Sequence, residues 1–195
     1  MKSSVFAAGL RLSGLRCLVV GTGHEAAPRA RALLAAGAVL RVVSASPPPE
    51  LAALRSSVAE FHQRAFEEHD LDGVWLAVST DLDATLSARV FAAASARQIF
   101  FCALDQPEYC TFSHPALARS GDVTIAISTN GRAPALARRL REEMERVLAE
   151  ANLPAFVEWL ARLREKTPSA DRREVLGKAV SGVRFTGRLE TPPEE

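Results

Sequence analysis

The sequence has almost no excess of charge of either sign. Its 195 residues include 24 Lys and Arg against 23 Asp and Glu, which gives a formal net charge of +1. A protein that binds nucleic acid needs a marked basic excess to neutralise phosphate groups. The composition therefore excludes nucleic acid as the main partner.

Long hydrophobic runs are missing as well. No stretch approaches the roughly 18 consecutive apolar residues of a membrane span. The first residues, MKSSVF, contain no apolar core of the kind that a secretory signal requires. We therefore expect a protein without a membrane partner, located in the cytoplasm.

Cysteine and histidine are scarce. The three cysteines, Cys17, Cys102 and Cys110, are odd in number and lack the spacing of a metal site, so we interpret them as free thiols in a reducing compartment. The four histidines form no cluster at ligand spacing, and His114 is a candidate ligand only because of the segment in which it lies. The sequence leaves the metal ligands unknown.

Apolar residues are plentiful, at 48% of the chain, which is enough for a hydrophobic core. Short apolar runs alternate with helical stretches from about residue 15 to 150, and this alternation predicts an α/β fold with a Rossmann-like, doubly wound parallel sheet. We expect strands at 16–20, 39–43, 63–66, 74–78, 99–103 and 123–127, and helices at 26–36, 50–58, 83–96 and 134–150.

The strand pattern stops after Glu150. Two further helices are expected at 153–166 and 172–180, in a tail that is too small to hold a core of its own. We therefore divide the chain into a Rossmann-like domain (1–117), a strand–helix dimerisation unit (118–150) and a helical tail (151–195). The amphipathic helices of the tail need a partner surface, which predicts a homodimer.

A glycine-rich turn joins the first strand to the first helix. The segment Gly21-Thr22-Gly23-His24-Glu25-Ala26 has the pattern G-x-G-x-x-A. In this position the first glycine permits the tight turn, the second lets backbone amides approach a pyrophosphate, and the small last residue lets the helix pack on the strand. The turn predicts an NAD-binding domain; the alternative is a tight turn that binds nothing.

Two features depart from the usual dinucleotide pattern. The second strand ends in Val43-Ser44-Ala45-Ser46, with no acidic residue, so Ser44, Ala45 and Ser46 would line the adenosine ribose. Pro28 removes a backbone hydrogen bond if the helix begins at His24, so we expect a late or distorted helix start.

Polar residues follow three of the predicted strands. Asp105 comes soon after the fifth strand, Ser79-Thr80-Asp81 follows the fourth, and Ser128-Thr129-Asn130-Gly131 follows the sixth. The carboxyl ends of parallel strands face one ligand crevice, so we expect these loops to share an edge. Ordinary turn chemistry is the alternative for each of them.

Four segments of the chain combine the motifs described above with the residues beside them: 17–23 (CLVVGTG), 77–81 (AVSTD), 105–116 (DQPEYCTFSHPA) and 125–138 (IAISTNGRAPALAR). Together they resemble the precorrin-2 dehydrogenase/sirohydrochlorin ferrochelatase module of siroheme synthases. Their order and spacing match the family from about residue 5 to 150. The helical tail resembles the region of the family that makes the dimer and covers the substrate.

The resemblance implies NAD-dependent oxidation of precorrin-2 to sirohydrochlorin, in some members followed by insertion of Fe2+. The key aspartate of the family falls on Asp105, which could act as the general base, while Ser79 and Thr80 would approach the nicotinamide. A tetrapyrrole substrate rich in carboxylates needs cations and polar groups around it. The candidates are Arg119, Ser128, Thr129, Asn130, Arg132 and Arg138.

Several residues depart from the family pattern. Cys102 and Leu86 stand where the family usually has asparagine, Pro28 where basic residues are common, and Ala133 where a serine would cap the next helix. Serine to alanine at such a position costs about 1 kcal/mol. These departures leave two alternatives open: a sirohydrochlorin metal chelatase without redox activity, and a non-catalytic tetrapyrrole-binding protein.

Overall fold

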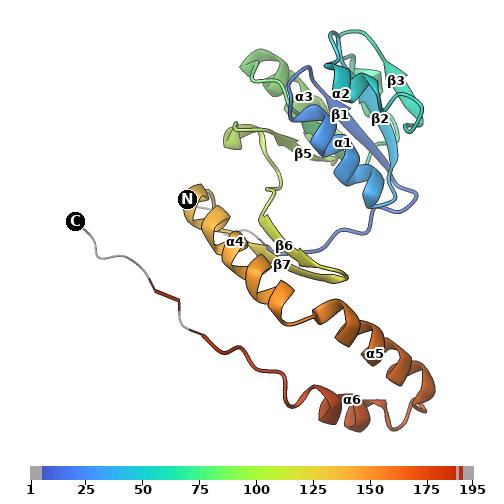
Figure 1. Cartoon of the computed structure of the whole chain (residues 1–195). Coiled ribbons are helices and arrows are strands. Elements are labelled where there is room, and N and C mark those ends of the chain that lie inside the picture. Colours follow the sequence, from blue (N-terminus) through green and yellow to red (C-terminus); the bar gives the residue numbers. More distant parts are fainter. Residues whose placement is uncertain (1–5, 188, 191–195) are drawn as a thin grey trace. The chain divides into compact units, whose positions relative to one another are not determined.

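The computed structural model describes residues 6–187, 189 and 190 (Figure 1). The chain forms two compact units that divide between His114 and Pro115. The elements of the first unit are β1 (Arg16–Val20), α1 (Ala26–Ala35), β2 (Val39–Val43), α2 (Pro49–Ala52), β3 (Glu60–His62), η1 (Glu68–Leu71), β4 (Leu76–Ser79), α3 (Ala84–Ala96), β5 (Phe100–Ala103) and η2 (Pro107–Tyr109).

The first unit is built on a five-stranded parallel sheet with the order β3-β2-β1-β4-β5. The chain moves outward from β1 to β3 and then returns to place β4 on the other side of β1. The switch in direction therefore lies between β1 and β4, which is where open α/β sheets bind ligands. The predicted Rossmann-like, doubly wound fold is confirmed.

Both faces of this sheet are covered by apolar side chains. Leu18 and Val20 of β1 belong to the core that includes α3, whereas Cys17 and Val19 belong to the core that includes α1 and α2. Successive residues of a strand point to opposite faces, so a strand covered on both faces needs an unbroken apolar run. The sequence of β1 satisfies this requirement.

The first helix begins late, as expected. α1 starts at Ala26, so Pro28 is its third residue, and its missing N–H is one of the first four that have no acceptor within a helix. Pro28 therefore costs no helical hydrogen bond. The helix ends at Ala35, and Gly37, which follows its C-cap Ala36, has φ +79° and lets the amide of Ala38 reach the carbonyl of Leu33 at 3.1 Å.

Two predictions for this unit are wrong in detail. The third strand covers Glu60–His62 rather than 63–66, because Arg41 on β2 donates to both carboxylate oxygens of Glu60, at 2.8 and 3.0 Å, and this pair holds the register. Residues 63–66 become a loop at the carboxyl edge. Helix α2 ends at Ala52 rather than near Val58, and turns follow it.

The second unit contains β6 (Ala116–Ser120), β7 (Val123–Ile127), α4 (Pro134–Glu150), α5 (Leu153–Lys166) and α6 (Arg172–Val180). Its three helices have the predicted bounds. The strand expected at 123–127 does not join the parallel sheet, because β7 pairs antiparallel with β6 across a short turn at Gly121, which has φ +56°. β6 was not predicted, and a domain boundary at 117 would fall inside it.

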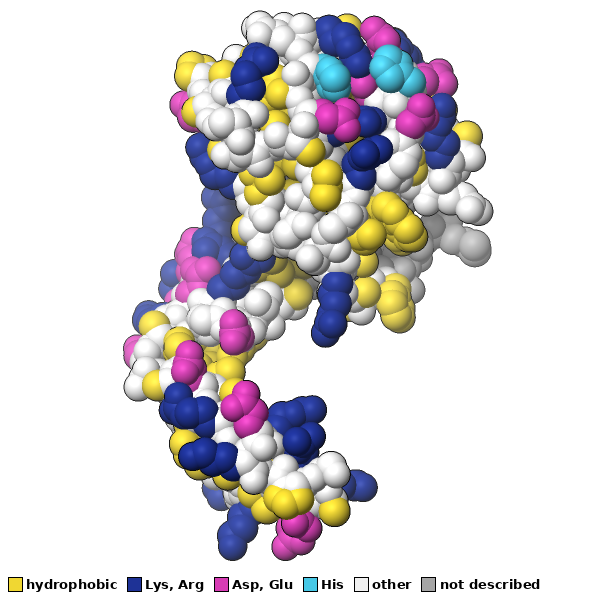
Figure 2. Space-filling view, turned by 90° about the vertical axis from the view of Figure 1, so that its right-hand side faces the viewer, with side chains coloured by type: hydrophobic (Ala, Val, Ile, Leu, Met, Phe, Trp, Pro, Cys, Tyr) yellow, Lys and Arg dark blue, Asp and Glu magenta, His cyan; other side chains and the backbone are white. Residues whose placement is uncertain are grey.

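Burial is sparse in the second unit. Helix α4 packs on the β6–β7 hairpin but buries only Ala137 and Leu148, and α5 and α6 bury no residue fully. Figure 2 shows hydrophobic side chains beside charged ones over these helices. Within the described residues, no helix combines the length and the apolar character that crossing a membrane requires.

Candidate functional site

The glycine turn after β1 is held against the loop after β4. Gly21 has φ +138°, and a Cβ atom there would lie 2.3 Å from Thr80 Oγ1 and 3.1 Å from the amide nitrogen of Asp81. A Cβ atom on Gly23 would lie 3.0 Å from the carbonyl oxygen of Thr80. Gly21 therefore requires glycine, for close approach as well as for backbone conformation, whereas a Cβ atom on Gly23 would make one tight contact with the Thr80 carbonyl.

A carboxylate already contacts this turn. The amide and the hydroxyl of Thr22 both donate to Asp81 Oδ1, each at 2.7 Å. In a G-x-G turn such amides are available to an anion. Asp81 therefore satisfies locally a donor that a bound pyrophosphate would otherwise use, and it places a negative charge beside it.

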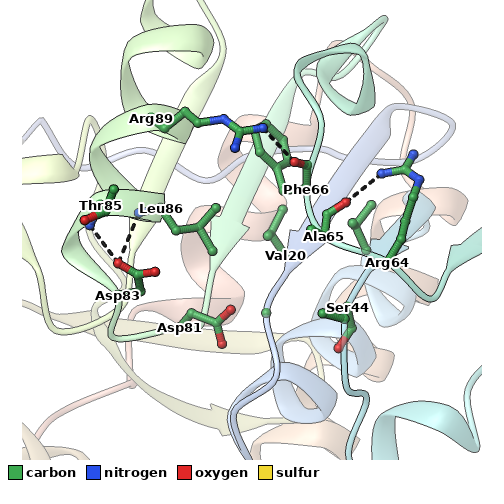
Figure 3. A pocket seen from close by; sticks show the side chains of 13 residues that line it. Val20, Ser44, Arg64, Ala65, Phe66, Asp81, Asp83, Thr85, Leu86 and Arg89 are labelled. Carbon is green, nitrogen blue, oxygen red and sulfur yellow. Dashed lines mark hydrogen bonds between the residues drawn. The ribbon is translucent and has the colours of Figure 1, made fainter.

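A cavity of about 270 Å³ opens beside the turn at the carboxyl edge of the sheet (Figure 3). It is lined by Gly21, Ser44 and Ala45 among the predicted residues, and by the 64–66 loop and the start of α3. In Figure 3, Asp81 lies on one side of the end of β1 and Ser44 on the other. The cavity thus occupies the place that the strand order assigns to a ligand.

Ser44 offers an unused polar group in this cavity. Its backbone amide donates to the carbonyl of His62 at 3.0 Å, but its Oγ is buried and has no hydrogen-bond partner among the described residues, and the side chain is 1% exposed. Buried polar groups are nearly always paired, so an orphaned hydroxyl at the wall of a cavity indicates a place for a ligand atom.

Two arginines line the cavity, and their surroundings differ. Arg64 donates to both carboxylate oxygens of Asp70, at 2.8 and 2.7 Å, so its charge is neutralised. Burial opposes ionisation of Asp70, but the hydrogen bonds from Arg64 and from the Glu67 amide outweigh it and lower the pKa of Asp70. Arg89 donates to the carbonyl of Phe66 at 2.7 Å and has no carboxylate partner in the described chain.

Asp105 lies beyond the end of β5, on the same edge. Its side chain is exposed, it makes no side-chain hydrogen bond within the described residues, and its backbone has φ +56°. The next residue, Gln106, donates from Nε2 to the carbonyl of Asp81 at 3.0 Å. The Asp105 segment is therefore joined to the loop that contacts the glycine turn, although Asp105 does not line the cavity.

Two thiols flank the Asp105 segment. The Sγ of Cys110 lies 3.5 Å from the Sγ of Cys102, and it donates weakly to the carbonyls of Ala103 and Gln106, at 3.2 and 3.4 Å. Burial, and after it the neighbouring Cys110, raise the pKa of the Cys102 thiol. Cys102 is therefore protonated at neutral pH.

The other predicted cofactor residues lie outside the cavity lining. Ser79 and Thr80 are buried, and the amide of Thr80 donates to the carbonyl of Val20. Ser46 and the ring of His24 are exposed to solvent. Glu25 forms an ion pair with Arg29, with its Oε2 atom 3.3 Å from Arg29 Nη2. The turn, Ser44 and Ala45 are thus brought together, whereas Ser46, Ser79 and Thr80 flank them.

The predicted substrate residues all belong to the second unit. The hydroxyls of Ser128 and Thr129 accept hydrogen bonds from the amides of Asn130 and Ala133, at 3.1 and 3.2 Å, which is turn chemistry. Because β7 lies in a separate hairpin, the expectation that this loop follows a strand of the main sheet is wrong. Three predicted cations are exposed and have no carboxylate partner in the described chain: Arg119, Arg132 and Arg138.

Sequence reasoning missed three charged residues of the cavity: Arg64, Asp83 and Arg89. A third strand placed at 60–62 would have put Arg64 two residues after its end, at the carboxyl edge. Asp83 accepts the amides of Thr85 and Leu86 and caps α3, a signal that the sequence does contain. The described residues hold no group of three potential metal ligands, and the His114 ring packs on Phe112 with centroids 5.0 Å apart.

The parallel sheet, the glycine turn and the cavity at the switch point together define a dinucleotide-binding Rossmann domain. A model of the family described as "Putative NAD(P)-binding" matches residues 8–116, and one described as "Sirohaem biosynthesis protein central" matches residues 121–146. The first match covers more than half of the chain. The chain belongs to this NAD(P)-binding family.

Its relatives include siroheme synthases. The chain is 32% identical to the siroheme synthase of Acinetobacter baylyi over 88% of its own length and 38% of the relative, and 36% identical to siroheme synthase 1 of Aeromonas salmonicida over 90% and 38%. It thus spans less than two fifths of these relatives. The solved structure "SirC, precorrin-2 dehydrogenase" shares the fold, with a TM-score of 0.78 and 22% identity over 91% of this chain and 90% of that one. The resemblance found in the sequence is confirmed.

Proposed function

We propose that the chain is an NAD+-dependent dehydrogenase that oxidises precorrin-2 to sirohydrochlorin in siroheme biosynthesis. One observation carries the proposal: hydrogen bonds run from Gln106 to Asp81 and from Thr22 to Asp81, so the Asp105 segment is tied to the glycine turn. A nucleotide site and a candidate base are therefore joined on one edge of the sheet.

The residues present fit a dinucleotide. Ser44 supplies an orphaned buried hydroxyl, and Gly21 and Gly23 let the turn lie close against the loop after β4 at the edge of the cavity. Ser44, Ala45 and Ser46 would hold the adenosine ribose, the turn from Gly21 to Glu25 the pyrophosphate, and Ser79 and Thr80 would support the nicotinamide half. NAD+, when bound, supplies the hydride acceptor.

Asp105 is the proposed general base. Removing two hydrogens from a tetrapyrrole to a nicotinamide means transferring one hydride and releasing one proton. The carboxylate of Asp105 is exposed and makes no side-chain hydrogen bond within the described chain, so it can take that proton. Its φ of +56° is a conformation that aspartate and asparagine adopt more readily than most residues, which keeps the side chain at this place in the loop.

The second unit would bind the substrate and a second subunit. The exposed side chains of Arg119, Arg132 and Arg138 can each pair with a carboxylate of the tetrapyrrole. The absence of fully buried residues in α5 and α6 supports a homodimer, in which a partner covers their apolar faces. Insertion of Fe2+ and a cytoplasmic location stay predictions.

A turnover assay tests the proposal. The purified chain is titrated with NAD+ and NADP+ and then supplied with precorrin-2 in the presence and absence of NAD+. Sirohydrochlorin formed only with nucleotide supports the dehydrogenase. Absence of binding to either nucleotide at millimolar concentration refutes it. Iron insertion into sirohydrochlorin without nucleotide would favour the chelatase, and tight tetrapyrrole binding without turnover would favour the carrier.

A further inference from the structure

Cys102 and Cys110 enclose the segment that carries Asp105. Cys102 is near the end of β5 and is 6% exposed, while Cys110 follows η2 and is half-buried, so solvent reaches the second thiol more readily. Their sulfur atoms are 3.5 Å apart. A disulfide bond needs about 2.05 Å, so the two atoms must approach by only about 1.5 Å.

The backbone around the two thiols is already closed. The amide of Thr111 donates to the carbonyl of Phe101 at 2.7 Å, and the amide of Phe101 donates to the hydroxyl of Thr111 at 2.8 Å. These two bonds join the residues next to Cys102 and Cys110. Linking the thiols therefore closes a ring whose ends already meet, and little chain entropy is lost.

We propose that Cys102 and Cys110 form a reversible disulfide, so that this loop is a thiol-redox site. No third His, Cys, Asp or Glu ligand completes a metal site here within the described residues, which favours thiol chemistry over metal binding. The third cysteine, Cys17, is fully buried on β1, with a pKa raised to about 11 by burial, and has no part in the pair.

Glutathione disulfide is the oxidant of this proposal, and the exposure pattern makes Cys110 rather than Cys102 the thiol that meets it first. The half-buried thiolate of Cys110 attacks it, forming a Cys110–glutathione mixed disulfide and releasing one glutathione. The Sγ of Cys102 then attacks the Sγ of Cys110 and releases the second glutathione, which takes the proton of Cys102. Two electrons pass from the two cysteines to glutathione disulfide, and excess glutathione reverses the reaction.

Oxidation also changes what holds the loop. The thiol proton of Cys110 is lost, and with it the contacts to the carbonyls of Ala103 and Gln106, on either side of Asp105. A misplacement of about 1 Å in a reacting group costs up to about 100-fold in rate. If the proposed dehydrogenase function holds, on which this consequence rests, the oxidised protein turns over precorrin-2 more slowly than the reduced protein.

Thiol counting and intact mass test the pair without reference to activity. After incubation with glutathione disulfide, the wild-type protein is expected to lose two hydrogens in mass and to keep one thiol, Cys17, which is counted after denaturation because it is fully buried. Cys102→Ser lacks the second thiol and should stop as a stable glutathione adduct at Cys110. Cys110→Ser should remain unmodified, because Cys102 is buried. Thermal unfolding verifies that both variants are folded.

Two results would overturn the proposal. One is a wild-type protein that keeps all three thiols at every ratio of glutathione disulfide to glutathione, including glutathione disulfide alone. The other is a wild-type protein that stops at the same glutathione adduct as Cys102→Ser. Equal turnover by oxidised and reduced wild-type protein would remove the link to Asp105. If the chain fails to oxidise precorrin-2 under any condition, the mass and thiol results still decide whether the disulfide forms.

Discussion

Gly21 is the residue at which a single methyl group should do most damage. In Gly21→Ala the new Cβ atom would lie 2.3 Å from Thr80 Oγ1, 3.1 Å from the amide nitrogen of Asp81 and 3.2 Å from that of Thr80. The backbone at this position also has φ +138°, which an L-residue with a Cβ atom rarely adopts. The substitution therefore combines steric overlap with backbone strain.

The two costs can be estimated separately. Strained backbone of this kind costs about 1–3 kcal/mol. The overlap adds about 1–3 kcal/mol, as in other overpacked sites. Thr80 is 6% exposed, so it has little space to rotate away, and two of the three contacts are to backbone atoms. We expect Gly21→Ala to lower the free energy of unfolding by about 2–6 kcal/mol.

Urea unfolding of four variants separates these effects. Gly131→Ala is the control for backbone strain, because Gly131 has φ +72° but no atom lies within 4 Å of the position that an added Cβ atom would take. Thr80→Ala removes the nearest contact, so the double variant Gly21→Ala/Thr80→Ala should recover part of the loss. In NAD+ titrations of the folded single variants, Gly21→Ala should bind NAD+ more weakly than the parent, because Gly21 lines the cavity.

The reasoning fails if Gly21→Ala unfolds within about 0.5 kcal/mol of the parent, which is the range of ordinary surface substitutions. It also fails if Gly131→Ala costs as much as Gly21→Ala, since the contacts with the loop after β4 would then contribute nothing. If the losses of stability in the two single variants add up in the double variant, the overlap with Thr80 Oγ1 makes no contribution to the cost of Gly21→Ala.

Four other substitutions test the site. Ser44→Ala should weaken NAD+ binding about fivefold through loss of one hydrogen bond, without lowering the melting temperature. Ser87→Ala loses an equally orphaned buried hydroxyl outside the cavity lining and should leave NAD+ binding unchanged, so equal NAD+ affinities of the two variants would exclude Ser44 from the site. Asp81→Asn keeps an acceptor but removes a charge, so NAD+ should bind more tightly by calorimetry at low salt, with the gain shrinking as salt rises; weaker binding would contradict this. Asp105→Asn suits φ +56° and should cut precorrin-2 turnover by about 10²–10⁴ while leaving NAD+ affinity intact, and activity within about threefold of the parent would remove Asp105 from the mechanism. Asp70→Asn breaks a buried ion pair and should lower the free energy of unfolding by about 3 kcal/mol near pH 7. The folded-state pKa of Asp70 is lowered, so its stabilising contribution is present above the unfolded-state pKa of about 3.9 and is lost as the pH falls through the folded-state pKa. The melting temperatures of parent and variant should therefore converge at acidic pH, and a gap that stays constant with pH would refute the assignment.

The elements that the sequence predicted correctly are those that depend on short-range patterns. β1 is apolar without a break from Cys17 to Val20, as a strand covered on both faces requires, and α4 has the predicted bounds because its apolar residues repeat at helical spacing and Pro134 begins it. The turn at Gly21 was readable because close approach and left-handed backbone leave no other residue type suitable. Local sterics and periodicity suffice for these features.

The elements that the sequence did not predict depend on distant partners. β3 has only three residues, and its position follows from the ion pair between Arg41 and Glu60, which are 19 residues apart. β6 exists because it pairs with β7 in a hairpin, a choice that a strand pattern alone does not distinguish from joining the main sheet.

The candidate site divides in the same way. The identity of the glycine turn, the absence of an acid after β2 and the position of Asp105 after β5 could all be read along the chain. The hydrogen bonds from Thr22 and Gln106 to the Asp81 loop, the orphaned hydroxyl of Ser44 and the 3.5 Å thiol pair arise only when separate loops meet at one edge of the sheet. Local sequence sets which residue types can occupy a turn or a strand, whereas long-range strand pairing sets which side chains become neighbours.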